Sequence, residues 1–78
     1  MSPFALDLSE HARIRIKERR ISRSQIRTCI AKERSVGSQP GGRQLKRIKF
    51  GKRALEVIYL SKQDGVVVIT AYWRNVWP

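Results

Sequence analysis

His11, Arg15 and Arg19 follow one another at intervals of four residues in a stretch with helical apolar spacing. Side chains four residues apart share one strip of a helix. Histidine is the side chain that titrates near neutral pH, so His11 can exchange a proton with a ligand while Arg15 holds a phosphate beside it. In a plainer interpretation, His11 hydrogen-bonds at the helix start and Arg15 pairs with Glu18. The spacing is compatible with both interpretations.

The charge balance indicates which ligand these groups would meet. The 78 residues include 17 Lys and Arg against 6 Asp and Glu, a net charge of +11. The positive charges of the chain repel one another, and binding to a polyanion relieves this repulsion, so nucleic acid is the expected partner. At 41% apolar residues the chain is too hydrophobic for a disordered basic tail. We expect one folded domain, residues 1–78, which is too small for a multi-domain enzyme or a large cofactor fold.

Cysteine and histidine usage bears on metals and on cellular compartment. Cys29 and His11 are the only residues of their types, too few for a disulfide or a structural zinc site, so we expect no metal and no cofactor. A lone cysteine fits a reducing compartment. The first ten residues lack the regions of a signal peptide, and the longest apolar stretch, residues 66–69, is far below the roughly 20 residues that span a bilayer. We expect a cytoplasmic protein without membrane contact.

The first half of the chain predicts two helices. Ser9, with Asp7 as an equally good alternative, can cap a helix that runs to about Arg20. Ser22 and Gln25 form a capping box at the start of a second helix, which runs to about residue 32. The stretch 35–42, SVGSQPGG, is rich in Gly and Pro. Neither a helix nor a strand ladder is expected to persist there.

The second half predicts an antiparallel meander. Residues 43–50, 53–60 and 66–73 are rich in β-branched and aromatic types, and they are joined by Gly51-Lys52 and by a turn ending in Asp64-Gly65. A short extended lead at residues 4–8 precedes the first helix. The expected fold is α+β, with an N-terminal helical hairpin packed on a three- to four-stranded antiparallel meander sheet.

Register follows from the first hairpin. A two-residue turn pairs Phe50 with Arg53 and places Arg47 opposite Glu56. Alternation then divides the strands into two faces. One face holds Ile48, Leu55, Val57, Tyr59, Thr70, Tyr72 and Arg74, and the other holds Leu45, Arg47, Lys49, Glu56, Ile58, Ile69, Ala71 and Trp73. Because charges are costly to bury, we expect the helices on the Val57 face. The basic face stays open, and it suits a single-stranded nucleic acid.

Further candidates for nucleic-acid contact lie along the whole chain. They are Arg19, Arg23, Arg27, Arg53, Arg74 and Trp73. A solvated basic surface is the plainer explanation for any one of the cations. Trp73 suits stacking on a base or contact with a partner equally well.

Residues 8–22, LSEHARIRIKERRIS, resemble the His-Ala-x-x-Arg signature of a small bacterial family known as a domain of unknown function. Residues 51–59 and 69–72 resemble its later strands, which read Gly-x-x-x-hydrophobic, Val-hydrophobic-Tyr and Val/Ile-Thr-x-Tyr. The similarity spans roughly residues 8–74, and the chain is identified as a member. That family in turn resembles, more distantly, the RelE/ParE toxin superfamily, in which a helical hairpin packs on an antiparallel sheet.

The resemblance implies a toxin-type endoribonuclease of a bacterial toxin–antitoxin system. RelE-type members cut messenger RNA, usually on the ribosome, and an antitoxin neutralises them; here we expect a small acidic protein. ParE-type members share the fold but poison gyrase, a protein target. The basic composition also fits a third hypothesis, a non-catalytic module that binds RNA or DNA.

Metal-independent RNA cleavage needs a base, cations that hold the phosphorane, and an acid. His11 or Glu56 could be the base, and Tyr72 or protonated His11 the acid. The cations expected to hold the phosphorane are Arg15, Arg47 and Lys49. The RelE pattern has an arginine where this chain has Glu56. In plainer terms, Tyr72 is a core aromatic residue and Arg47–Glu56 a cross-strand ion pair.

Overall fold

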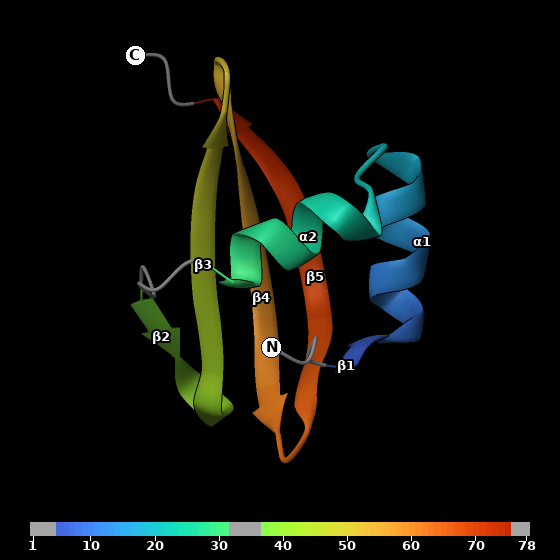
Figure 1. Cartoon of the computed structure of the whole chain (residues 1–78), viewed down its shortest axis with the longest axis vertical. Helices are drawn as coiled ribbons and strands as arrows, with labels where there is room; N and C mark the ends of the chain where they lie inside the picture. Colours follow the sequence, from blue (N-terminus) through green and yellow to red (C-terminus); the bar gives the residue numbers. More distant parts are fainter. Residues whose placement is uncertain (1–4, 32–36, 76–78) are drawn as a thin grey trace.

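Five strands and two α-helices make up the part of the chain that the computed structural model describes, residues 5–31 and 37–75 (Figure 1). The elements are β1 (Ala5–Leu8), α1 (Glu10–Glu18), α2 (Arg23–Ala31), β2 (Gly37–Gln39), the 3-10 turn η1 (Pro40–Gly42), β3 (Arg43–Phe50), β4 (Arg53–Lys62) and β5 (Gly65–Asn75). The two expected helices and the three long strands are therefore confirmed as elements.

The strands form one mixed sheet in the order β1-β5-β4-β3-β2. The meander of β3, β4 and β5 is antiparallel, as predicted. The prediction of a wholly antiparallel sheet of three to four strands is wrong, because β1 adds to the outer edge of β5 in parallel and β2 adds to β3. The Gly/Pro-rich stretch does take part in a ladder. Gly41 and Gly42 adopt φ angles of 83° and 79°, which turn the chain back so that β2 can pair with β3.

Both hairpins of the meander have two-residue turns. Gly51 takes a φ of 66°, and Phe50 pairs with Arg53 as predicted. The second turn, at Gln63 and Asp64, pairs Lys62 with Gly65. A Cβ atom at Gly65 would lie 2.1 Å from the carbonyl oxygen of Ala5. Only glycine allows β1 to approach β5 this closely.

A β-bulge at Ile69 changes the faces of β5. Tyr59 pairs with Val68 but Ile58 pairs with Thr70, so Ile69 has no partner on β4. Beyond the bulge every side chain of β5 changes face relative to the simple alternation. The predicted placement of Thr70, Tyr72 and Arg74 with Val57 is therefore wrong. These three lie on the face of Glu56, while Ala71 and Trp73 lie on the face of Val57 and Leu55.

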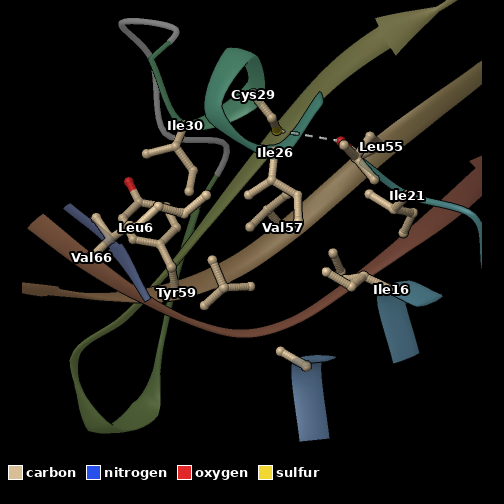
Figure 2. Close-up of a cluster of buried hydrophobic side chains, with 13 residues drawn as sticks. Leu6, Ile16, Ile21, Ile26, Cys29, Ile30, Leu55, Val57, Tyr59 and Val66 are labelled. Atoms are coloured by element: carbon tan, nitrogen blue, oxygen red, sulfur yellow. Dashed lines mark hydrogen bonds between the residues drawn. The ribbon is translucent and has the colours of Figure 1, made fainter. Parts of the chain in front are cut away.

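Both helices cover the Val57 side of the sheet, as the cost of burying charge predicted. In Figure 1, α1 runs along β5 and α2 crosses β4 and β3. Figure 2 shows the core between these layers, where Ile16, Ile21 and Ile26 meet Leu55 and Val57. Ile26, Leu55 and Val57 are completely buried, and each such side chain contributes about 1.5–3 kcal/mol through burial.

The N-terminus of α1 is anchored to the bulge. Ser9 accepts a 3.0 Å hydrogen bond from the Ala12 amide, as its predicted role of N-cap requires. Its own amide donates to the Val68 carbonyl at 3.1 Å, and its hydroxyl donates to the Ile69 carbonyl at 3.3 Å. Residues of β5 thus fix where the helix begins.

The connection between the helices is short. The predicted end of α1 near Arg20 is late, because the helix ends at Glu18 and Arg20 takes a φ of 55°. The Ile21 amide then donates to the Ile16 carbonyl at 2.9 Å, a bond typical of a left-handed helix end. This turn brings Ile21 back into the core. The capping box is confirmed, because Ser22 and Gln25 bond each other's amides at 3.0 and 2.9 Å.

Candidate functional site

Glu56 is the one charged residue in the interior of the described chain, with an exposed fraction of 1%. It lies in the middle of β4, directly opposite Arg47 on β3 and Tyr72 on β5. No described helix covers this face of the sheet. The carboxylate is therefore buried by the side chains around it and not by a second layer of secondary structure.

Three residues bond the two carboxylate oxygens of Glu56. Its Oε2 accepts from Arg47 Nη2 at 2.6 Å and Nε at 2.7 Å, and from Arg74 Nη1 at 3.2 Å. Its Oε1 accepts from the Tyr72 hydroxyl at 2.7 Å. The predicted cross-strand ion pair of Arg47 with Glu56 is confirmed. Charge-assisted bonds of this length are about twice as strong as neutral ones, so the four side chains form one rigid cluster, hereafter the Glu56 cluster.

The Glu56 cluster has defined protonation states at neutral pH. Burial alone would raise the pKa of Glu56, but the hydrogen bonds from Tyr72 and Arg47 and the charge of Arg47 outweigh it and hold this pKa below its ordinary value. The hydrogen bond to Glu56, together with burial, raises the pKa of Tyr72. Glu56 is thus an anion and Tyr72 a neutral phenol that can donate its proton.

The sheet register extends the cluster by one row. Next to the row Arg47–Glu56–Tyr72, the three strands place Lys49, Ala54 and Arg74 side by side. Ala54 is buried and carries only a methyl group, while Lys49 and Arg74 are exposed. Three cations, two of them bonded to Glu56, therefore lie in two neighbouring rows of this face. Such a surface attracts anions and can hold them by paired hydrogen bonds from arginine.

His11 and Arg15 do not join the Glu56 cluster. They lie on α1, which packs on the opposite face of the sheet through Ala12 and Ile16. His11 is exposed. Arg15 bonds Glu18 at 3.0 Å on the surface of the helix, which confirms the plainer interpretation of Arg15. The predicted catalytic set is therefore divided between two faces of the molecule.

Several of the predicted nucleic-acid contacts make bonds within the protein. Arg19 donates to the Ala71 carbonyl at 2.8 Å and Arg23 donates to the Leu6 carbonyl at 2.8 Å. Both bonds attach a helix to a strand. Arg27 is half-buried on α2. Arg19 and Arg23 thus have structural roles, and both residues remain exposed in part.

Trp73 and Arg53 lie together at the end of the sheet near the first hairpin. The Arg53 guanidinium is 4.1 Å from the centre of the Trp73 ring, and Phe50 meets that ring edge-on at 6.0 Å. The indole nitrogen donates to the Arg19 carbonyl at 2.9 Å. Trp73 is thus a packed residue on the helix side, away from the Glu56 cluster.

Sequence reasoning missed two features of this site. It assigned Arg74 to general nucleic-acid contact but not to Glu56, and it gave Ala54 no role. The placement of Arg74, and its pairing with Ala54, depend on the bulge at Ile69, and residues 67–70, Val-Val-Ile-Thr, contain no Gly or Pro that would mark it. One signal in the sequence could have indicated the bulge. Simple alternation places Arg74 under the helices, and burial of an arginine there would be costly.

The remaining chemical groups do not form a second site. Cys29 is buried in the core, where burial raises the pKa of its thiol to about 11, so it stays protonated and unreactive. No cluster of metal-binding side chains occurs within residues 5–31 and 37–75. In those same residues, neither helix has the length and apolar character needed to cross a membrane.

Comparison with known proteins gives a family but no relative of known activity. No curated protein matches the chain, and no solved structure does. One family model, described as a domain of unknown function (DUF4258), matches residues 8–73. That match includes α1, nearly all of the core and three members of the Glu56 cluster, Arg47, Glu56 and Tyr72, whereas Arg74 lies just beyond it. The chain therefore belongs to the DUF4258 family.

Proposed function

We propose that this protein is a RelE-like endoribonuclease that binds single-stranded RNA on the open face of the sheet and cleaves it without a metal ion. The observation that carries the proposal is the row Arg47–Glu56–Tyr72, which joins a cation, a carboxylate and a phenol by bonds of 2.6 to 2.7 Å. These are the group types that RNA cleavage requires.

Binding would use both charge and apolar surface. Arg47, Lys49 and Arg74 lie at one end of the open face. The adjoining row contains Leu45 and Ile58, both half-buried. Cations that follow a backbone, next to apolar surface that meets bases, are the arrangement by which proteins bind single strands without reading sequence.

The cleavage step is a transfer within the RNA. The 2′-oxygen forms a bond to phosphorus, and the bond from phosphorus to the 5′-oxygen breaks. Glu56 takes the 2′-hydroxyl proton and Tyr72 gives its proton to the leaving 5′-oxygen. Transfer of a proton from Glu56 to Tyr72 along their 2.7 Å bond then restores the starting state. The products are a 2′,3′-cyclic phosphate and a 5′-hydroxyl, and no water is consumed.

The cations carry the electrostatic part of this mechanism. Arg47 and Arg74 would bind the phosphorane oxygens, where negative charge develops during the reaction. Where the RelE pattern has an arginine, this chain has Glu56, and Arg74 supplies a guanidinium from the neighbouring strand. The substitution thus moves the second cation from β4 to β5.

The proposed cellular role is that of a cytoplasmic toxin. Its substrate would be messenger RNA, bound to the ribosome or free, and a small acidic antitoxin would neutralise it. The net charge of +11 supports both partners.

The test is to incubate the purified protein with single-stranded RNA and, separately, with translating ribosomes. We expect fragments that end in a 2′,3′-cyclic phosphate, and their loss in the Tyr72→Phe variant. Lys17→Ala, an exposed cation on α1, is the control and should cleave like the wild type. Binding of RNA without cleavage of either substrate would contradict the enzymatic proposal.

A second candidate is a non-catalytic module that binds RNA or DNA. It is favoured by one observation, that both oxygens of Glu56 are already bonded within the protein. In that case the cluster would stiffen a binding surface and do no chemistry. Absence of both RNA binding and cleavage, with retention of toxicity in cells, would instead favour a ParE-like protein target.

A further inference from the structure

Arg47 and Arg74 donate to the same oxygen of Glu56 although they come from strands on opposite sides of β4. Arg47 makes two of these bonds and Arg74 one. A phosphate oxygen can likewise accept hydrogen bonds from two guanidiniums, because carboxylate and phosphate present similar acceptor geometry. Glu56 therefore occupies, within the protein, the kind of position that a bound phosphate would fill.

The depth of these groups differs. The Glu56 side chain is 1% exposed, whereas the side chains of Arg47 and Arg74 are 38% and 59% exposed. An anion that approaches the open face meets the guanidiniums before it meets the carboxylate. Movement of the arginines would uncover the Oε2 atom of Glu56, to which both of them donate.

The neighbouring row has a short side chain at its centre. Ala54 lies between Lys49 and Arg74 and presents only a methyl group, which the surrounding side chains bury completely. A phosphate above Ala54 would have Lys49 on one side and Arg74 on the other. A long side chain at this position would obstruct it.

We propose that Glu56 competes with RNA for Arg47 and Arg74, so that both guanidiniums leave the carboxylate and bind one backbone phosphate of a single-stranded RNA above Ala54. This rests on the proposed function, in which the open face is the RNA surface. The exchange has a chemical consequence. It uncovers Glu56 and removes contacts with Arg47 that hold its pKa low, so the carboxylate becomes a stronger base when substrate is bound.

The first experiment measures binding without cleavage. The probe is a fluorescent single-stranded oligouridylate with 2′-O-methyl groups, which cannot be cleaved through the 2′-oxygen. We expect Glu56→Gln to bind it about fivefold more tightly than the wild type, the equivalent of one partly exposed ion pair. The control is Glu18→Gln, which neutralises an ion-paired glutamate on α1. This variant should change the affinity less than twofold.

A double-variant cycle separates competition from general electrostatics. In an Arg47→Ala, Arg74→Ala background Glu56 has no guanidinium to withhold, so Glu56→Gln should change the affinity less than twofold. A general loss of negative charge would increase affinity in this background as well. That result, or weaker binding by Glu56→Gln in the wild-type background, would overturn the competition.

A measurement on the wild-type protein covers the case in which Glu56→Gln does not fold. The Arg47 Nε–H group donates to Glu56 at 2.7 Å, and its nitrogen and proton resonances report that bond. They should move when the 2′-O-methyl oligouridylate is added, while those of Arg15 on α1 stay unchanged. Unmoved Arg47 resonances at saturating RNA overturn the inference and leave the proposed RNA surface intact. Failure of the wild type to bind RNA overturns both.

Discussion

The Tyr72 hydroxyl donates a 2.7 Å hydrogen bond to Oε1 of Glu56 because an unpaired residue, Ile69, changes the face of β5 three positions earlier. Without the bulge, Tyr72 would lie under the helices and Glu56 would pair with Ala71 of β5. One additional residue in a strand thus determines whether the cluster exists.

We first expect removal of that hydroxyl to affect catalysis more than stability. Tyr72→Phe should reduce RNA cleavage by about 10²-fold, the usual effect of losing a general acid. Its free energy of unfolding in urea should fall by about 2 kcal/mol, because one charge-assisted hydrogen bond to a buried carboxylate is lost. Tyr59→Phe, which removes a hydroxyl from the helix-covered face, is the control and should retain full cleavage. Equal activity in both variants would exclude Tyr72 as the acid.

The Glu56 cluster should make stability depend on pH in the acid range. The pKa of Glu56 is lower in the folded protein than its ordinary value of 4.5, so folding favours the carboxylate. Its stabilisation is present above pH 4.5 and is lost as the pH falls through the folded value. The difference in unfolding free energy between wild type and Glu56→Gln, measured by urea titration from pH 7 to 3, should therefore shrink below pH 4.5. A constant difference would contradict the ionised cluster.

Salt dependence tests where RNA binds. The double variant Arg47→Ala, Lys49→Ala should lower the slope of log affinity against log salt by about 1–2, because up to two phosphate contacts are lost. The matched double variant Arg13→Ala, Lys17→Ala removes two exposed cations from α1 and should leave the slope nearly unchanged. The reverse pattern would place the RNA surface on the helix.

His11 and Arg15 on α1 are tested separately. Because His11 and Arg15 lie on the helix side of the sheet, we expect His11→Ala and Arg15→Ala to retain RNA cleavage within about threefold of wild type, well short of the 10²-fold loss of a catalytic group. The rates should be measured with both variants shown to be folded by circular dichroism. A loss of about 10²-fold in either variant would return the active site to α1.

The connection between the helices offers a stability prediction. Arg20 holds a φ of 55°, a conformation that costs a residue with a Cβ about 1–2 kcal/mol. Arg20→Gly should therefore raise the free energy of unfolding by about 1 kcal/mol. Arg13→Gly, within α1, should lower it by about 1 kcal/mol. Both values can be read from urea titrations, and a destabilised Arg20→Gly variant would show that the Arg20 side chain has a role of its own.

The sequence by itself determined the features that depend on neighbouring residues. Gly51 permits a tight turn, and that turn settles that Arg47 faces Glu56. Ser22 and Gln25 lie one helical turn apart, so their capping box could be read directly. The cost of burying Arg47 and Lys49 also predicted which face the helices cover. These features share a physical basis, because each depends on local geometry or on the charge of the residues concerned.

Only the tertiary structure decided the position of the bulge, the parallel pairing of β1 and the separation of His11 from Glu56. The bulge is held by bonds between residues far apart in the chain: Ser9 bonds the carbonyls of Val68 and Ile69, and Arg19 bonds that of Ala71. A one-residue shift in register costs little locally, and these distant contacts determine which register is favoured. Side-chain alternation, which assumes no such contacts, therefore predicts β3 and β4 correctly and fails in the second half of β5.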